Sequence, residues 1–268
     1  MNQKVIDFHV HFPAKIYPKN EKEEQFSYQI EHLIEEMDRS NTAISLISSI
    51  EPMLRNNWSS LSDGRGKKYG GNEVAAEVIE QSKGRLIGAF VPNCFQNAAM
   101  IKKDIHFFTV SHHFKAIKLH PWLGAFPANA QELYPVFEIA SELELPVLYH
   151  SGTIPFTTPA EMFDMAKQFP RVKIVMGHSG GTELWHDVMA LVEYADNLLI
   201  ETSGQPNRIF LEKFVEHYGS ERVLYGSDWL GTSGKMIFRQ IEIHELNVSD
   251  QDKENILVRN ARRLLKLP

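Results

Sequence analysis

The chain has 268 residues, of which 43% are hydrophobic and 23% charged, a composition typical of an ordinary globular protein with a large core. Its formal net charge of −6 and isoelectric point near 6.1 argue against phosphate-backbone binding, and no run is rich in Lys and Arg, so we expect no nucleic-acid partner. No apolar run approaches the ~20 residues of a membrane span, so we expect no membrane partner.

Short apolar runs typical of β-strands recur along the chain, and there are eight of them: Val5–Phe8, Ala43–Ile50, Arg85–Val91, Ala116–Leu119, Pro146–Tyr149, Lys173–Met176, Leu198–Ile200 and Val223–Tyr225. Segments with the 3.6-residue periodicity of helices lie between them. Examples are SYQIEHLIEEMDRS, NEVAAEVIEQSKG, AQELYPVFEIASELEL and TELWHDVMALVEYA, the last with Thr182 as its predicted N-cap. This alternation favours an α/β fold of the (β/α)8 TIM-barrel type, with a doubly wound open sheet as the alternative.

No shift in composition and no Pro/Gly/Ser-rich linker divides the sequence, so we expect a single barrel domain over residues 1–268. The longest irregular piece, Glu51–Gly71, follows the second predicted strand. A loop of this length in a compact domain is typical of a lid or a binding loop. It carries Arg55, Trp58, Arg65, Lys67, Lys68 and Tyr69.

The cysteine content and the N-terminus bear on the cellular compartment. Cys94 is the single cysteine and cannot form an internal disulfide. The N-terminus lacks the charged and then apolar pattern of a signal peptide. We therefore expect a cytoplasmic protein.

Polar residues follow the predicted strands where each one ends: His9 and His11, then Lys118, His120, His150, His178, Glu201 and Asp228. From His120 onward the successive strand-end residues His150, His178, Glu201 and Asp228 are separated by 30, 28, 23 and 27 residues, each about one βα unit. In a TIM barrel the carboxyl ends of the strands form one rim, where active sites lie. We therefore expect these groups to converge.

Residues two apart on a strand point the same way, so His9 and His11 can hold one metal ion together. Adding His150 and Asp228 gives three imidazoles and one carboxylate. This donor set suits one divalent ion, with zinc expected first and manganese, iron or cobalt as alternatives. A position left open for water matters because a bound metal lowers the pKa of water toward ~7 and polarises a carbonyl.

The other strand-end residues have a functional and a structural interpretation. His178, in IVMGHSGG, is predicted to be catalytic, with a loop-holding role as the alternative. His120 either lines the substrate pocket or makes a structural hydrogen bond. Lys118 is a buried structural amine, a partner for a substrate carboxylate, or a carbamylated bridge to a second ion. Glu201 is expected to orient a histidine through its ring N–H.

Aromatic and basic residues in the predicted βα loops suggest the substrate class. Trp58, Trp122, Phe126, Phe156 and Trp229 would form an apolar wall, and Arg55, Arg65 and Lys118 would meet a carboxylate. The alternative is that these rings pack the loops onto the barrel. A small acidic or aromatic carbonyl compound fits the first interpretation, and a homodimer is the default assembly.

Six motifs together resemble the amidohydrolase superfamily, in particular its amidohydrolase-2 branch: DFHVH, KLHP, PVLYHSG, MGHSGG, LYGSDW and ENILVRNARRLLKL. The resemblance spans Val5 to Leu267 and implies a distorted (β/α)8 barrel. It also implies a metal held by His9, His11, His150 and Asp228. His178 then matches a second metal ligand in dinuclear members and a catalytic histidine in mononuclear ones.

The branch contains lactone and amide hydrolases as well as non-oxidative decarboxylases similar to aminocarboxymuconate-semialdehyde decarboxylase. We predict a hydrolase in which Asp228 or His178 takes a proton from water. His9 favours hydrolysis, because many decarboxylase relatives carry Glu or Ala at that position. Decarboxylation of an aromatic or unsaturated acid is the alternative, and a metal-binding barrel without catalysis is a third hypothesis. His120 and its following proline are typical of the mononuclear branch, so we expect one tightly held ion.

Overall fold

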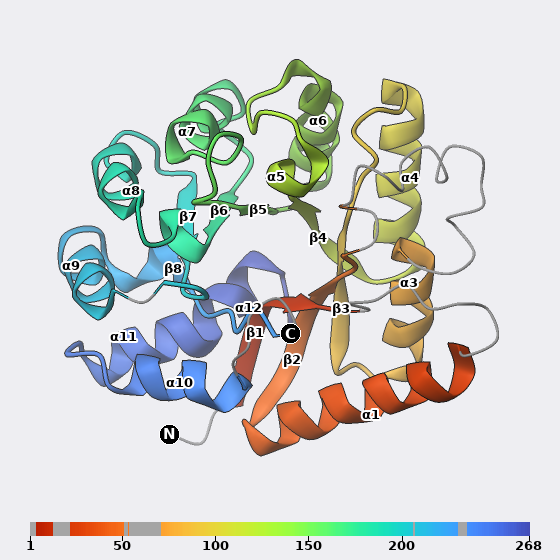
Figure 1. The fold of residues 1–268 in the computed structure, drawn as a ribbon, viewed down its shortest axis with the longest axis horizontal. Coiled ribbons are helices and arrows are strands. Elements are labelled where there is room, and N and C mark those ends of the chain that lie inside the picture. Colours follow the sequence, from red (N-terminus) through yellow and green to blue (C-terminus); the bar gives the residue numbers. More distant parts are fainter. Residues whose placement is uncertain (1–3, 13–21, 51–52, 54–70, 206, 230–234) are drawn as a thin grey trace.

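The computed structural model describes residues 4–12, 22–50, 53, 71–205, 207–229 and 235–268. Its eight parallel strands pair in chain order from β1 to β8, and helices surround them (Figure 1). Each strand therefore lies beside the one that follows it in sequence, whereas the strand order of a doubly wound sheet reverses at a switch point. The fold is a (β/α)8 TIM barrel, which confirms the expected class and excludes the open-sheet alternative.

All eight predicted strands are present, with ends that differ from the prediction by a few residues. The strands are β1 Val5–His11, β2 Thr42–Ser48, β3 Leu86–Phe90, β4 Phe114–Leu119, β5 Val147–His150, β6 Ile174–Gly177, β7 Leu198–Glu201 and β8 Val223–Leu224. The largest difference is at β1, which continues through both histidines because its pairing with β2 extends to His11 and Ser48. The two imidazoles thus belong to the strand, as their two-residue spacing predicted.

Helices follow the strands and form the outer layer of the barrel. They are α1 Lys22–Arg39, α3 Asn72–Gln81, α4 Ala98–Ser111, α5 Pro121–Gly124, α6 Tyr134–Leu143, α7 Pro159–Gln168, α8 Trp185–Val192, α9 Arg208–Tyr218, α10 Met236–His244, α11 Asp250–Glu254 and α12 Asn260–Leu264. Short 3₁₀ turns lie at η4 Gln131–Leu133, η5 His178–Gly180 and η6 Ser220–Arg222, and a π-helical turn, η7 Asn255–Arg259, joins α11 to α12.

The junction between the last and the first strand is held by single backbone hydrogen bonds. The N–H of Phe8 donates to the carbonyl of Tyr225 (2.9 Å), that of Asp228 to His9 (2.8 Å) and that of His11 to Trp229 (3.1 Å). Because these bonds alternate between the two segments, the chain that follows β8 runs directly beside the end of β1. This arrangement brings Asp228 next to the two histidines.

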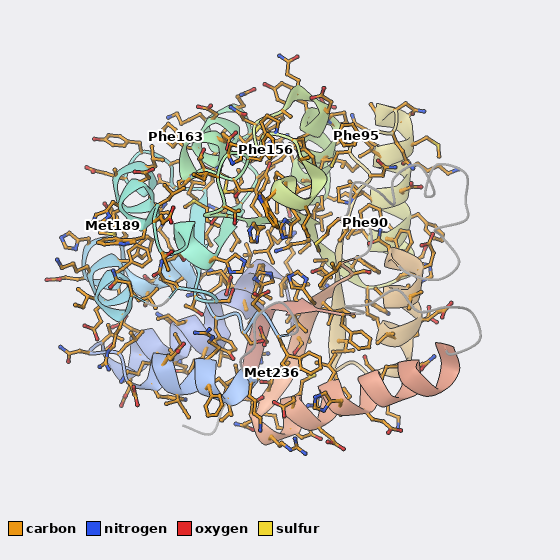
Figure 2. All side chains as sticks on the ribbon, viewed as in Figure 1. Phe90, Phe95, Phe156, Phe163, Met189 and Met236 are labelled. Carbon is orange, nitrogen blue, oxygen red and sulfur yellow. The ribbon has the colours of Figure 1, made fainter. Side chains whose placement is uncertain are left out.

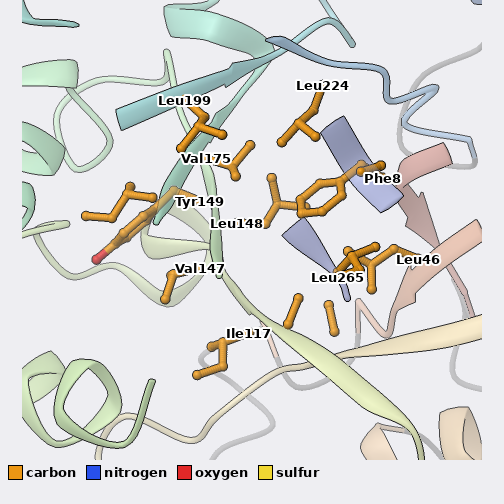
Figure 3. Packing of buried hydrophobic residues seen from close by; sticks show 14 of the residues in the cluster. Phe8, Leu46, Ile117, Val147, Leu148, Tyr149, Val175, Leu199, Leu224 and Leu265 are labelled. Atoms are coloured by element: carbon orange, nitrogen blue, oxygen red, sulfur yellow. The ribbon is translucent and has the colours of Figure 1, made fainter. Parts of the chain in front are cut away.

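Apolar side chains fill the barrel below this rim. Leu148, Val175 and Phe8, from β5, β6 and β1, lie together in one buried cluster (Figure 3). Outside the strands, Phe163 of α7 and Met189 of α8 belong to the helical layer and pack partly buried against the core (Figure 2). The strands are therefore covered on both faces, as parallel sheets require.

One sequence prediction differs from the structure, and another falls mostly on residues that the structure does not describe. The N-cap prediction for Thr182 was wrong, because α8 begins at Trp185 with Leu184 as its N-cap. The N–H of Leu184 donates to the carbonyl of Gly180 (3.1 Å), so a turn continues to that point before the helix begins. Of the expected lid at 51–71, only Met53 and Gly71 are among the described residues. No helix in the described part of the chain is long and apolar enough to span a membrane.

Candidate metal centre and active site

Strand β1 presents its imidazoles on one face of the barrel end. The Nε2 atoms of His9 and His11 lie 3.3 Å apart, and the two residues are 0% and 5% exposed. This geometry agrees with the expectation that residues two apart on a strand point the same way. Two ring nitrogens at this separation and depth can both contact one ion.

Asp228, which follows β8, lies beside the imidazoles of His9 and His11 on β1. Its Oδ1 lies 3.1 Å from His11 Nε2 and 3.5 Å from His9 Nε2. Burial alone would raise the pKa of Asp228, but the adjacent imidazoles of His9 and His11 hold it below its usual value. The carboxylate is therefore charged at neutral pH and can act as a metal ligand.

His150 and His178 add two further imidazoles. His178 Nε2 lies 3.0 Å from His150 Nδ1, and the ring centroids of His178 and His9 are 5.1 Å apart. One atom each from His9, His178 and Asp228 lies within 4.8 Å of the others, a spacing that can hold a metal ion. This group contains His178, which the sequence predicts as catalytic and, in a dinuclear site, as a ligand.

Both residues predicted to be catalytic have left-handed backbone conformations. The φ angle is +66° at His178 and +52° at Asp228. Side chains other than glycine adopt this region only at a cost, and such residues concentrate at functional sites. The two glycines after His178 also have positive φ, and a Cβ on Gly180 would meet Val188 Cγ2 at 2.9 Å. The glycines therefore allow the loop to keep His178 in its left-handed conformation.

The protonation of two rings fits metal binding. His9 Nδ1 lies 3.0 Å from a carboxylate oxygen of Glu201, and His178 Nδ1 lies 3.2 Å from the backbone carbonyl of Ser203. Because both acceptors lack protons, each Nδ1 must carry the hydrogen and each Nε2 keeps a lone pair. Burial lowers the pKa of both imidazoles, so they are neutral, the form that binds metals.

Lys118 points into the same cluster. It is fully buried, and its Nζ lies 2.8 Å from His9 Nε2. Burial lowers the pKa of this amine to about 8. The amine thus contacts the Nε2 of His9 directly, although burial makes its charged form less favourable than in water.

The remaining predicted substrate-binding residues lie at different distances from the cluster. His120 stacks on His150 with ring centroids 3.9 Å apart, and its Nδ1 accepts a hydrogen bond from Leu123 N (3.4 Å). The structural hydrogen bond is therefore present, and a role in the substrate pocket stays a prediction. Trp122 is 47% exposed, with its ring 6.3 Å from that of His120. Trp229 is buried, and its ring lies 5.4 Å from the ring of His32 on α1.

Among the other predicted pocket residues, Phe126 is buried with its ring 5.9 Å from that of Phe95, and Phe156 is half-buried. Arg55, Trp58 and Arg65 lie outside the described residues.

The amidohydrolase profile (Amidohydro_2) matches residues 6–267, nearly the whole chain. The chain belongs to the amidohydrolase family. No curated protein sequence matches it. The family assignment agrees with the resemblance found in the motifs.

Solved structures of several proteins share this amidohydrolase fold. One is 4-oxalomesaconate hydratase from Rhodopseudomonas palustris, with a TM-score of 0.71, 17% identity, and coverage of 98% of this chain and 95% of the other. Another is 5-carboxyvanillate decarboxylase from Sphingomonas paucimobilis (TM-score 0.73, 15% identity, 99% of each chain). A third is a dihydroxybenzoic acid decarboxylase from Polaromonas with bound manganese and 2-nitroresorcinol (TM-score 0.73, 13% identity, 98% and 97%). At these identities the likeness shows the fold alone.

Two hydroxyl side chains orient the other imidazoles of this amidohydrolase and were not identified from the sequence. Ser48 Oγ lies 3.3 Å from His11 Nδ1, and Thr153 Oγ1 lies 2.9 Å from His150 Nε2. Partners of this kind fix the orientation of a ring whose other nitrogen faces a metal. Ser and Thr are too common in loops for the sequence to single them out.

Asp7 is a third residue that the sequence analysis missed. Its Oδ1 accepts hydrogen bonds from the backbone N–H groups of His9 (3.1 Å) and Ser227 (3.0 Å), so it links β1 to the chain after β8. Burial raises the pKa of Asp7 to about 7. The alternation of Asp7, His9 and His11 in DFHVH was the available signal, because all three share a two-residue spacing.

The site also depends on a glycine at the end of β8, which gives a first prediction. A Cβ on Gly226 would meet Glu201 Oε1 at 2.1 Å and His9 Cβ at 2.7 Å. Gly226→Ala must therefore displace Glu201 or His9, and we expect metal affinity to fall about 10-fold or more, as measured by competition with a chelator.

The matched control is Gly84→Ala, at a glycine with φ +83° and nothing within 4 Å of an added Cβ. It should lower thermal stability through backbone strain and leave metal affinity unchanged. Equal metal affinities in the two variants would show that the space around Glu201 is not required.

Proposed function

We propose that the protein is a metal-dependent hydrolase that acts on a small lactone, ester or amide. In this proposal one divalent ion is held by His9, His11, His150 and Asp228. Zinc is the first candidate, because neutral imidazoles and a carboxylate are its usual ligands, and manganese is the second. The observation that carries the proposal is the meeting of His9, His178 and Asp228 at one buried centre, where one possible ligand atom from each lies within 4.8 Å of the others.

The residues of the site can perform the proton transfers of hydrolysis. When bound, the divalent ion would supply the Lewis acidity that lowers the pKa of water and polarises a carbonyl. The carboxylate of Asp228 is charged and takes a proton from the attacking water; His178 Nε2 is the alternative base. The same group then returns the proton to the oxygen or nitrogen of the leaving group.

Substrate binding is assigned to the residues around this centre. Lys118 would pair with a substrate carboxylate, because its ammonium is buried beside the metal-facing nitrogen of His9. His120 and Trp122 would line the side of the pocket at β4 and α5, and Trp229 the side at the end of β8. The substrate class that fits is a small acidic or aromatic carbonyl compound.

Decarboxylation is the second candidate, because two of the structures with this fold are decarboxylases of aromatic acids and one of them carries manganese. That reaction must deliver a proton to carbon. Burial lowers the pKa of His9, His120, His150 and His178, so these rings are neutral at neutral pH and hold no extra proton to deliver to carbon. Lys118 is the group of this cluster that would supply such a proton. The neutral imidazoles favour hydrolysis.

Isotopic labelling separates the two reactions. We expect the zinc- or manganese-loaded protein, incubated in H₂¹⁸O with a panel of lactones, esters, amides and aromatic acids, to place one ¹⁸O atom in the product carboxylate. Release of CO₂, with solvent deuterium on carbon when the reaction is run in D₂O, would instead establish decarboxylation. Asp228→Asn is the control for background hydrolysis. A metal-loaded protein with no turnover across the panel would favour the non-catalytic hypothesis.

A further inference from the structure

A single serine connects two histidines of the site to a buried carboxylate. Ser203 follows β7, and its Oγ lies 2.7 Å from Glu201 Oε2, 3.0 Å from His178 Nδ1 and 3.2 Å from His9 Nδ1. Ser203, Glu201 and His9 are each 0% exposed, and His178 is 8% exposed. With so little exposure, the protein groups must satisfy one another.

The supply of hydrogens fixes the direction of these bonds. A serine hydroxyl has one hydrogen and two lone pairs, and a carboxylate only accepts. The Ser203 hydroxyl therefore donates to Glu201, which leaves its lone pairs for the two imidazoles. Each Nδ1 must then donate toward Ser203 or Glu201, and each Nε2 is left without a hydrogen. The Nε2 of His9 faces Lys118 and His11, and that of His178 faces His150.

Glu201 reaches the two rings by different routes. Its Oε2 contacts the ring of His9 directly at 3.0 Å, but it meets only the backbone N–H of His178, at 3.2 Å. The ring of His178 is joined to this carboxylate through the Ser203 hydroxyl. The carbonyl of Ser203, 3.2 Å from His178 Nδ1, is a second acceptor for the same ring nitrogen.

Glycines flank this connection on both sides, where a side chain would collide with its members. A Cβ on Gly204, the residue after Ser203, would lie 2.8 Å from His178 Nδ1. A Cβ on Gly226, on the other side, would collide with Glu201 Oε1. Glycines at both positions let the carboxylate, the hydroxyl and the ring approach to hydrogen-bonding distance.

We propose that Ser203 is a positioning residue that relays the carboxylate of Glu201 to Nδ1 of His178. Glu201 thereby holds His9 directly and His178 through Ser203, with both Nε2 atoms turned to the centre. In catalysis this contact would hold the ring of His178 in place, with its Nε2 directed at the substrate. The catalytic part of this inference rests on the function proposed above, whereas the hydrogen-bond relay does not.

The relay is tested first by nuclear magnetic resonance on the metal-free protein, with ¹⁵N-labelled histidine. We expect Ser203→Ala to move the Nδ1–H signal of His178 and to speed its exchange with solvent, while the His9 signal changes less because its contact with Glu201 remains. His178→Asn and His9→Asn assign the two signals. Ser40→Ala, at a buried serine at the opposite end of the barrel, is the matched control and should change neither.

A double-mutant cycle separates a relay from independent contacts. In the Glu201→Gln background there is no carboxylate to relay, so Ser203→Ala should produce little further change in the His178 signal. Ser203→Cys, which keeps a weak donor, should give an intermediate shift. Equal shifts from Ser203→Ala in both backgrounds, or no shift in either, would overturn the relay.

Turnover provides a second reading that depends on the proposed function. In the metal-loaded protein Ser203→Ala should lower kcat about 10- to 100-fold, with KM changed less than about twofold. An unchanged kcat would refute the catalytic role of the relay. A wild-type protein without hydrolase activity would refute the proposed function, and the resonance measurements would still decide whether the relay exists.

Discussion

The double variant His9→Ala/His11→Ala is expected to bind no divalent metal and to have no activity. The wild-type protein should retain about one equivalent of zinc or manganese, as measured by elemental analysis after dialysis. The two Nε2 atoms are only 3.3 Å apart and almost fully buried, so their removal takes two ligands from a site that few other groups can complete. We expect the loss of turnover to exceed about 10³-fold, because the metal provides both water activation and carbonyl polarisation.

The matched control removes two histidines that lie on exposed helix surfaces, His106 on α4 and His217 on α9. The variant His106→Ala/His217→Ala should keep the metal and the activity of the wild type. Because the loss of His9 leaves Glu201 without its ring partner, the folded state of the test variant must be verified by circular dichroism, and His11→Gln provides a milder version. A folded His9/His11 variant that still holds one equivalent of metal would disprove the site.

The fold could be predicted from the sequence because burial on both faces makes each strand of a parallel barrel a short apolar run. The same criterion misjudged the length of β1. An apolar run ends at Phe8, yet backbone pairing with β2 continues to His11, because the histidines face the buried centre and not water. The apolar run alone therefore ends short of the strand, and it was the two-residue spacing of the histidines that placed them on it.

The convergence of the strand-end residues also followed from the sequence, since every barrel strand ends at the same rim. Glu201 was expected to contact a histidine ring, and its position 3.0 Å from His9 Nδ1 confirms this. The relation of Ser203 to His178 could not be foreseen. It depends on the turn after β7 and on the left-handed backbone of His178, which have no signature in residue spacing.

The placement of Trp229 shows another limit of sequence spacing. Its position next to Asp228 suggested a side chain that faces the substrate. The backbone of Asp228 is left-handed (φ +52°), however, so the chain turns there and the direction of the next side chain does not follow from that of Asp228. The indole packs near His32 of α1, while the backbone carbonyl of Trp229 accepts the hydrogen bond from His11. A substrate contact by this ring stays a prediction.

The variant His178→Asn is expected to lose activity by about 10³-fold or more and to keep most of its metal. In the proposed ligand set His178 lies outside the coordination of the ion and serves catalysis through its bare Nε2. Asparagine has a similar reach for the hydrogen bond to Ser203, but it provides no basic nitrogen. Metal content and kcat, measured on the same preparation, should therefore separate in this variant, whereas they fall together in His9→Ala/His11→Ala. His186→Asn, an exposed histidine on α8, is the matched control.

The same experiment tests how many ions the site holds. His178 Nε2 is close enough to His9 and Asp228 to join a metal site with them, and Lys118 approaches from β4 with a pKa of about 8. An amine with that pKa is partly uncharged near neutral pH, which is the form that a carbamylated bridge between two ions would need. If the wild type holds two equivalents, and Lys118→Ala and His178→Asn each lose one, the centre is dinuclear and the one-ion assignment is wrong. One equivalent in all three proteins would place His178 in catalysis alone.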